Sequence, residues 1–268
     1  MTRQSEGGVA GSVRLGAVSF LNTKPLIEGL DAERGVALRL DVPSKLPAML
    51  ARGEVDAALV PVVEWARAGS AWRIVSDACI GCDGETLTVR VFSRVPPNAV
   101  RRIVVDTDSR TSVVLAKLIW SGYYAREVAF APQSQGSLDD CEAVLLIGDK
   151  VVRAGRPGFP YQVDLGSVWK EWTGLPFVFA VWAADRGCDA GRLGRLLSAA
   201  RDRGVANARD LARRHGPVLG WPVELAEAYL TRHMQYVLTS AARGGMERFL
   251  DAARTAGLLD EPADAVAR

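Results

Sequence analysis

The feature that most constrains the fold of this chain is a pattern that occurs twice, in which an apolar strand runs into a polar turn and then a helix. The first copy has the apolar run Val13–Val18 followed by Ser19–Leu26, where Pro25 suits the first position of a helix. The second copy has the strand Arg102–Asp106 and the turn Thr107–Ser112. In an open α/β sheet, ligands bind at such turns, beside the free amides of the helix start. The repeat therefore predicts two α/β lobes.

The sequence between the two copies indicates strands that run parallel. Val36–Val42 alternates as a strand does, a helix is predicted from Pro43 to its end at Gly53, and Asp56–Val60 is a short apolar strand. Two successive strand–helix–strand units are typical of a parallel sheet in an α/β fold.

The chain is predicted to pass between the lobes twice. Thr86–Ser93, which alternates, and Leu175–Ala184, which is almost wholly apolar, are interpreted as the crossing segments. We therefore assign residues 12–92 and 183–268 to the first lobe and residues 93–182 to the second.

The C-terminal part of the chain has helical periodicity. Leu225, Tyr229 and Leu230 form one apolar stripe, which we interpret as core packing rather than as a cofactor surface. His215 and His233 fall in the same part and are expected to be surface or satisfied core residues.

Composition excludes several classes of protein. The 268 residues suffice for one large or two modest domains, and 49% apolar with 24% charged residues are ordinary values for a soluble protein. A net charge of +2, without a basic block interleaved with aromatics, argues against nucleic acid as a partner. Residues 1–12 are polar and do not form a secretory signal, and no apolar run could span a membrane. A cytoplasmic protein is expected; the oligomeric state is not indicated.

The cysteines do not indicate a metal or redox site. Cys79 and Cys82 have C-x-x-C spacing, which fits a redox pair or half of a zinc site, but no second C-x-x-C exists and both histidines lie far off. Reduced structural thiols are the favoured interpretation. No glycine fingerprint for a nucleotide, G-x-S-x-G elbow or zinc ligand set occurs, so no cofactor is expected.

Polar residues of the two turns form the candidate site. They are Ser19 and Asn22 in the first turn and Ser109, Arg110, Thr111 and Ser112 in the second. The guanidinium fork of Arg110 suits a carboxylate or a phosphate, and the neighbouring hydroxyls add donors where the helix offers amides. A capping role explains one of these residues but does not easily explain four.

Five stretches resemble the chorismate dehydratase family of the futalosine route to menaquinone, and the likeness runs from about Val13 to Leu259. The stretches are Ser19–Leu26, Gly81–Gly84, Ser109–Ser112, Val144–Asp149 and Asp164–Trp182. The resemblance implies a fold similar to type II periplasmic binding proteins, with two α/β lobes around a central cleft and two crossing segments. It also implies dehydration of chorismate to 3-[(1-carboxyvinyl)oxy]benzoate, with no metal or organic cofactor.

The resemblance gives the polar turns a role. Chorismate carries two carboxylates, which match Arg110 and the helix starts. The turn that contains Asn22 has no His, Asp or Glu. We therefore expect the enolpyruvyl carboxylate of the substrate to take the C3 proton, while Asn22 holds that carboxylate or the departing hydroxyl. Asp83 and Asp149 are the alternative bases, although Asp149 also suits a simple capping role.

The remaining candidates contact the substrate according to the same resemblance. Thr88 should face the cleft, on the side of its strand opposite Leu87, unless it only packs across the strands. Gly84 follows Asp83 in a turn. Gly148 either lets a ligand approach the backbone or only makes the bend after its strand.

Two other functions compete with the dehydratase. One is a cytosolic small-anion-binding protein without catalysis, which has the same two-lobed shape. The other is 1,4-dihydroxy-6-naphthoate synthase, a later enzyme of the same route with the same fold. Ser19–Leu26 fits the dehydratase better, and no histidine lies near a predicted cleft turn to act as a base.

Overall fold

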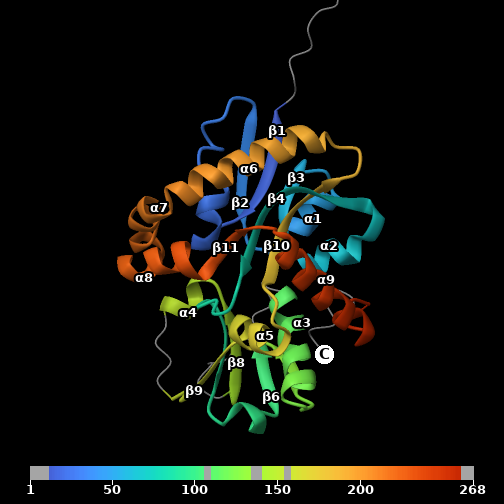
Figure 1. Ribbon diagram of the computed structural model, residues 1–268, viewed down its shortest axis with the longest axis vertical. Coiled ribbons are helices and arrows are strands. Elements are labelled where there is room, and N and C mark those ends of the chain that lie inside the picture. Colours follow the sequence, from blue (N-terminus) through green and yellow to red (C-terminus); the bar gives the residue numbers. More distant parts are fainter. Residues whose placement is uncertain (1–11, 106–109, 134–140, 154–157, 261–268) are drawn as a thin grey trace, which may run out of the picture.

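The computed structural model describes residues 12–105, 110–133, 141–153 and 158–260, and two β-sheets organise it (Figure 1). The first sheet has the strand order β11-β4-β10-β3-β1-β2. Its strands are β1 Val13–Val18, β2 Val36–Asp41, β3 Ala57–Pro61, β4 Trp72–Cys82, β10 Phe177–Asp185 and β11 Met234–Val237. The second sheet has the order β7-β6-β8-β5-β9. Its strands are β5 Val89–Ser93, β6 Arg102–Val105, β7 Ala129–Pro132, β8 Ala143–Ile147 and β9 Tyr161–Asp164.

The repeat seen in the sequence is a repeat of the fold. In the first sheet β1 lies between β2 and β3 and pairs with both in parallel, and in the second sheet β6 lies in the same way between β7 and β8. An antiparallel strand then flanks each unit, β10 beside β3 and β5 beside β8. The two lobes are therefore built on one plan, as the two strand-to-helix turns predicted.

Helices cover the sheets and join the lobes (Figure 1). The first lobe has η1 Leu21–Leu26, α1 Leu46–Ala51, α2 Val62–Ala68, α6 Ala190–Ala206, α7 Ala208–His215, α8 Val223–Ala228 and α9 Ser240–Thr255. The second lobe has α3 Arg110–Leu118, α4 Asp149–Arg153 and α5 Leu165–Thr173. Single turns complete the fold: η2 Gly69–Ala71, η3 Pro97–Ala99, η4 Ile119–Tyr123, η6 Pro217–Leu219 and η7 Tyr229–His233. Helix α9 packs on β10 and also contacts α3 of the other lobe.

The strand pairing differs from the predicted division of the chain. The predicted lobes were 12–92 with 183–268, and 93–182, but β5 pairs in the second sheet and β10 in the first. The chain therefore changes sheets between β4 and β5 and again between α5 and β10. Alternation and apolar runs indicate that a strand exists, but they carry no information on which partner the strand pairs with.

The first turn also differs in detail. Pro25 is not the first helical residue, because η1 starts at Leu21 and contains Pro25. The amide of Thr23 donates to Phe20 O, and that of Ile27 donates to Lys24 O. The hydrogen bonds of the short helix thus form before and after Pro25. None of them requires an N–H from Pro25 itself.

The thiols of Cys79 and Cys82 agree with a structural role. Both lie on β4, free and fully buried. Burial raises the pKa of Cys79 to about 12 and raises the pKa of Cys82 well above its usual range, so both stay protonated. Within the described ranges, none of the helices has the length and apolar character that a membrane span requires.

Two neighbouring glycines on α9 test how closely this helix packs against the segment that leads into β10. A Cβ at Gly245 would overlap the carbonyl oxygen of Pro176, just before β10, whereas a Cβ at Gly244 would meet open space. Gly245→Ala should lower the free energy of unfolding by about 1–3 kcal/mol, because a backbone oxygen cannot rotate away. Gly244→Ala, the control, should raise it by about 0.5–1 kcal/mol through helix propensity. Urea unfolding measures both, and equal midpoints for the two variants would contradict the fit.

Candidate active site

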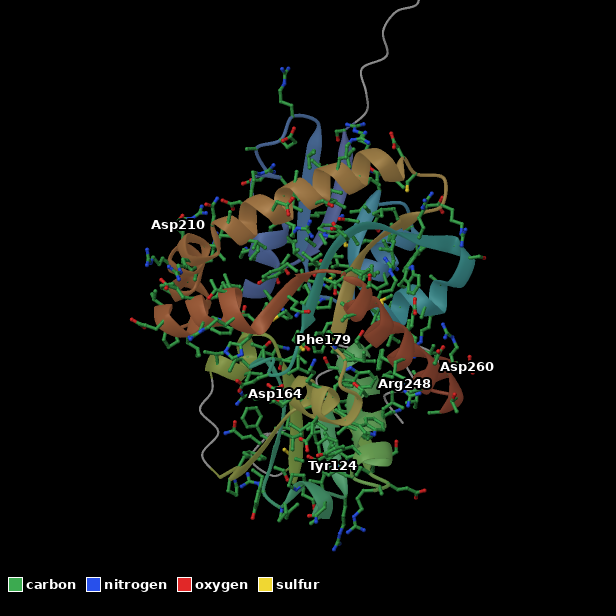
Figure 2. All side chains as sticks on the ribbon, viewed as in Figure 1. Tyr124, Asp164, Phe179, Asp210, Arg248 and Asp260 are labelled. Carbon is green, nitrogen blue, oxygen red and sulfur yellow. The ribbon has the colours of Figure 1, made fainter. Side chains whose placement is uncertain are left out.

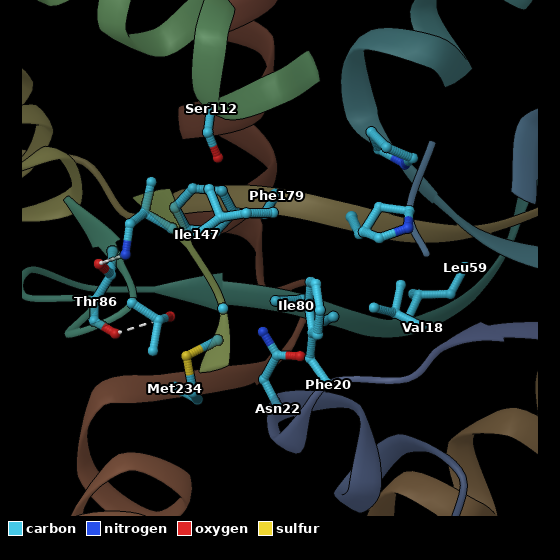
Figure 3. A pocket seen from close by; sticks show the side chains of 16 residues that line it. Val18, Phe20, Asn22, Leu59, Ile80, Thr86, Ser112, Ile147, Phe179 and Met234 are labelled. Atoms are coloured by element: carbon cyan, nitrogen blue, oxygen red, sulfur yellow. Dashed lines mark hydrogen bonds between the residues drawn. The ribbon is translucent and has the colours of Figure 1, made fainter. Parts of the chain in front are cut away.

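A cavity lies between the two lobes, where residues of both sheets meet (Figure 3). It is lined by Val18, Phe20, Asn22, Pro43, Leu59, Pro61, Ile80, Thr86, Thr88, Val89, Ser112, Ile147, Gly148, Phe179, Ala180 and Met234. All of these residues are uncharged. Phe179, labelled in Figure 2, comes from β10 at the middle of the molecule. The cavity is therefore an apolar space with a few hydroxyl and amide groups in its wall.

Four helices begin at the wall of this cavity. Strands β1, β3, β6 and β8 lead to η1, α2, α3 and α4, and residues at or next to each helix start line the cavity. From opposite sides, Ser112 of α3 and Asn22 of η1 point into the space in Figure 3. Amides at helix starts lack helical partners and carry partial positive charge. In η1 the first amide, at Leu21, already donates to Oδ1 of Asp149, and the positive ends of α2, α3 and α4 remain as the anion-attracting groups of an otherwise uncharged wall.

The structure brings four of the predicted site residues to the cavity: Asn22, Thr88, Ser112 and Gly148. It does not bring others there. Ser19 donates its amide to Asp41 O, and Thr111 is buried within α3. Ser109 lies outside the described residues.

The predicted turn at Asp83 and Gly84 also lies away from the cavity wall. Asp83 is partly exposed and forms an ion pair with Lys170 at 2.5 Å. Gly84 has a φ of +122°, and its carbonyl oxygen lies against Gly166. The predicted turn therefore exists, and it redirects the chain after β4 toward α5.

Arg110 is held by a carboxylate of the other lobe. Its Nη1 lies 3.1 Å from Oε1 of Glu64 on α2, and the same oxygen lies 2.8 Å from Nη1 of Arg67. Arg67 in turn donates to the carbonyl oxygens of Leu258 and Leu259, at 3.1 and 3.0 Å. In this arrangement the guanidinium of Arg110 is paired and does not line the cavity, which differs from its predicted position.

Gly148 makes the bend after β8 and allows a close contact. Its φ is +62°, and a Cβ there would lie 2.9 Å from the ring of Phe20. Its amide donates to Thr88 O at 2.9 Å. The glycine is thus required by its conformation and by the Phe20 ring; approach of a ligand to its backbone stays a prediction.

The segment that carries Thr88 is not the regular strand that alternation predicts. Leu87 has a φ of +61°, and β5 begins only at Val89, so Thr86, Thr88 and Val89 all line the cavity. The cause is Asp164, whose carboxylate accepts from the amides of Thr86 and Leu87 and from the Thr86 hydroxyl at 2.9–3.0 Å. Three hydrogen bonds to one carboxylate outweigh the cost of one residue in the left-handed region.

Asp149 lies buried behind the cavity and joins the lobes. Its Oδ1 accepts from Nε1 of Trp221 at 2.9 Å and from the amide of Leu21 at 3.4 Å. Both partners belong to the first lobe, whereas Asp149 begins α4 of the second. The amide of Leu21 is the first of η1, so the bond agrees with the capping alternative for Asp149, and the capped helix belongs to the other lobe.

Sequence reasoning missed Tyr229 and Trp221. Their rings stack with centroids 4.7 Å apart, and the Tyr229 hydroxyl lies 2.8 Å from Oγ1 of Thr88. Burial raises the pKa of Tyr229 above its usual range, and hydrogen bonds to Thr88 and Asn22 oppose the shift. Tyr229 belongs to the apolar stripe interpreted as core, and periodicity alone cannot show that its hydroxyl contacts Thr88 of the cavity wall.

The fold places the chain among proteins with the architecture of periplasmic binding proteins, as predicted. Protein AF1704 from Archaeoglobus fulgidus superposes with a TM-score of 0.76 at 16% identity, covering 94% of this chain and 100% of its own. The periplasmic aliphatic sulphonate binding protein SsuA from Escherichia coli has a TM-score of 0.61 at 11% identity, with 95% and 96% covered.

The sequence comparison gives the family. Residues 13–255 match the family described as menaquinone biosynthesis, and the chain belongs to it. The chorismate dehydratase of Thermus thermophilus is 29% identical over 261 residues, which cover 89% of this chain and 94% of that relative. The family resemblance indicated by the five sequence stretches is thereby confirmed.

Two buried tryptophans test the bond between Trp221 and Asp149. Trp221→Phe removes a donor to a buried carboxyl oxygen, whereas Trp182, equally buried, has an Nε1 without a hydrogen-bond partner among the described residues. Both replacements shorten an aromatic side chain, so their difference isolates the hydrogen bond. Trp221→Phe should cost about 1–3 kcal/mol more than Trp182→Phe in urea unfolding. Equal losses would show that this hydrogen bond does not stabilise the fold.

Proposed function

We propose that this protein is a lyase that dehydrates chorismate to 3-[(1-carboxyvinyl)oxy]benzoate in menaquinone biosynthesis. The observation that carries the proposal is the position of Asn22. It lies in the turn that bears the family resemblance, and its side chain points into an uncharged cavity at which four helices begin. Membership of the menaquinone-biosynthesis family and the likeness to the Thermus thermophilus enzyme support the same reaction.

The helix starts are the proposed ligands of the two carboxylates of chorismate. Amides at the starts of α2, α3 and α4, with the Ser112 hydroxyl, supply donors without a cationic side chain in the wall. Arg110 joins them only if it leaves Glu64, and we keep it, with its neighbours Ser109 and Thr111, as a proposed second ligand set. Because the cavity volume of about 60 Å³ is far below the roughly 300 Å³ of small ligand pockets, the lobes must part to admit the substrate.

The reaction breaks the C3–H and C4–O bonds of the ring and releases water. The negative charge that develops at C3 is conjugated with the ring carboxylate, so donors aimed at that carboxylate stabilise the transition state. Each such preorganised donor is worth about 3–4 kcal/mol. Formation of the aromatic ring then supplies the driving force.

The proton acceptor we propose is the enolpyruvyl carboxylate of the substrate itself. No Asp, Glu, His or Lys is present in the cavity wall. The Asp149 carboxyl is occupied by Trp221 and Leu21, and Asp83 pairs with Lys170 at the surface. The carboxylate takes the C3 proton and returns it to the departing C4 hydroxyl as water, while Asn22 holds this carboxylate or the hydroxyl.

A turnover assay tests the function. The purified protein incubated with chorismate should form the benzoate product, detected by chromatography with mass spectrometry. Asn22→Ala should lower kcat by about 100-fold or more and still bind chorismate. Asn207→Ala, at an exposed position at the end of α6, is the matched control and should keep full activity. Binding of chorismate without product would instead make the protein a small-anion-binding protein.

The identity of the base has its own test. Asp83→Asn and Asp149→Asn should both retain turnover, and Asn at 149 keeps an oxygen for Trp221 and Leu21. The pH dependence of kcat should then contain no inflection from a protein side chain. If either variant binds chorismate normally but no longer turns it over, that aspartate is the base and the substrate carboxylate is not.

A further inference from the structure

The second lobe contacts the two residues that lead into Asn22. Phe20 and Leu21 come directly before Asn22, whose side chain points into the cavity (Figure 3). The Phe20 ring packs over Gly148, where a Cβ would lie only 2.9 Å from the ring. The amide of Leu21 donates to Oδ1 of Asp149 at 3.4 Å. Two adjacent residues of the second lobe therefore hold the chain just ahead of the proposed reacting group.

The Asp149 carboxylate is itself held in place by a second donor from the first lobe. Nε1 of Trp221 lies 2.9 Å from the same Oδ1, and the Trp221 ring stacks on Tyr229 with centroids 4.7 Å apart. Asp149 is 6% exposed and Trp221 is 3% exposed. Hydrogen bonds to a buried carboxylate are strong, because water does not compete for the acceptor. The oxygen that receives the Leu21 amide therefore has a defined position.

The helix that carries Asn22 depends on this acceptor because it has no cap of its own. Its N-cap residue, Phe20, makes no side-chain hydrogen bond to the helix, and Pro25 lies inside the helix. A single short turn is unfavourable by itself, since few internal hydrogen bonds offset the entropy of ordering it. Asp149 supplies from the other lobe the cap that η1 lacks.

We propose that Asp149 is a positioning residue, which holds η1 so that Asn22 takes its place in the cavity only when the lobes are closed. The inference rests on the proposed function, because a reaction at Asn22 is what makes its placement matter. When the lobes part to admit the substrate, Leu21 and Trp221 lose their acceptor together, and η1 is free to move. Closure restores both bonds. Asp149 thus acts through η1 and does not touch the substrate.

Hydrogen exchange tests the contact without catalysis. Asp149→Leu removes the acceptor, so the Leu21 amide and the Trp221 indole N–H should both exchange about tenfold faster or more, as a lost hydrogen bond to a charged group implies. Asp149→Asn keeps Oδ1 as an acceptor and should leave both protected. Asp189→Leu is the matched control and should also leave both protected, because Asp189 is exposed and caps α6 through the Arg192 amide.

Trp221→Phe tests the same contact with Asp149 intact, and serves if Asp149→Leu does not fold. It removes the donor that fixes the carboxylate, so the Leu21 amide should again exchange faster. Trp182→Phe is its control, because Nε1 of Trp182 has no hydrogen-bond partner in the described part of the chain. If exchange at Leu21 stays at the wild-type rate in the variants that fold, the proposal is overturned.

Kinetics test whether Asp149 acts through Asn22. Asp149→Leu should lower kcat roughly tenfold to hundredfold, the range for a misplaced reacting group, and Asp149→Asn should recover most of that loss. In the Asn22→Ala background, measured in single turnovers with enzyme in excess, Asp149→Leu should cause little further loss. A merely structural role would instead lower the rate by the same factor in both backgrounds.

Two other outcomes count against the inference. An unchanged kcat in Asp149→Leu overturns the positioning role while the dehydratase stands, and a loss as large in Asp149→Asn makes Asp149 the base. A wild-type protein that forms no product from chorismate overturns the proposed function instead, and exchange at Leu21 then still reports whether Asp149 holds η1.

Discussion

The carboxylate of Asp164 is the interaction on which the rest of the structure depends. It accepts five hydrogen bonds from described residues: three from Thr86 and Leu87, and two from the first amides of α5, at Gly166 and Ser167. One side chain thus caps a helix of the second lobe and shapes the segment by which the chain enters that lobe. The absence of a side chain at Gly166 permits this, because a Cβ there would overlap Thr86. Thr88 reaches Tyr229 as a result.

A wall without charged side chains has a chemical advantage for a doubly charged ligand. A cationic side chain in an empty cavity would need its own counterion, and the substrate would have to displace it. Helix-start amides carry only partial charges and are held by the backbone. The pairing of Arg110 with Glu64, just outside the wall, keeps a full positive charge neutralised in this arrangement.

The sequence predicted features that depend on residues adjacent in the chain. It missed features that depend on contacts between residues far apart in the chain. The two strand-to-helix turns, and with them Asn22 and Ser112, follow from apolar runs and polar turns adjacent in the chain. The conformation of Leu87 depends on an acceptor 77 residues away, and the partner of Arg110 lies 46 residues away. Tyr229 was assigned to the core and does pack there, but its hydroxyl is oriented by tertiary contacts that periodicity does not encode.

The contacts of Arg67 connect the segment after α9 to the ion pair between Arg110 and Glu64. This residue donates to the carbonyl oxygens of Leu258 and Leu259 and shares the Glu64 carboxylate with Arg110. Proteolytic trimming before Leu258, or a tag that pulls this segment away, would withdraw both acceptors from Arg67. Arg67 would then bind Glu64 more strongly, and the ion pair between Glu64 and Arg110 would weaken. The segment after α9 can therefore influence how strongly the Arg110 guanidinium is bound, although it does not contact Arg110 directly.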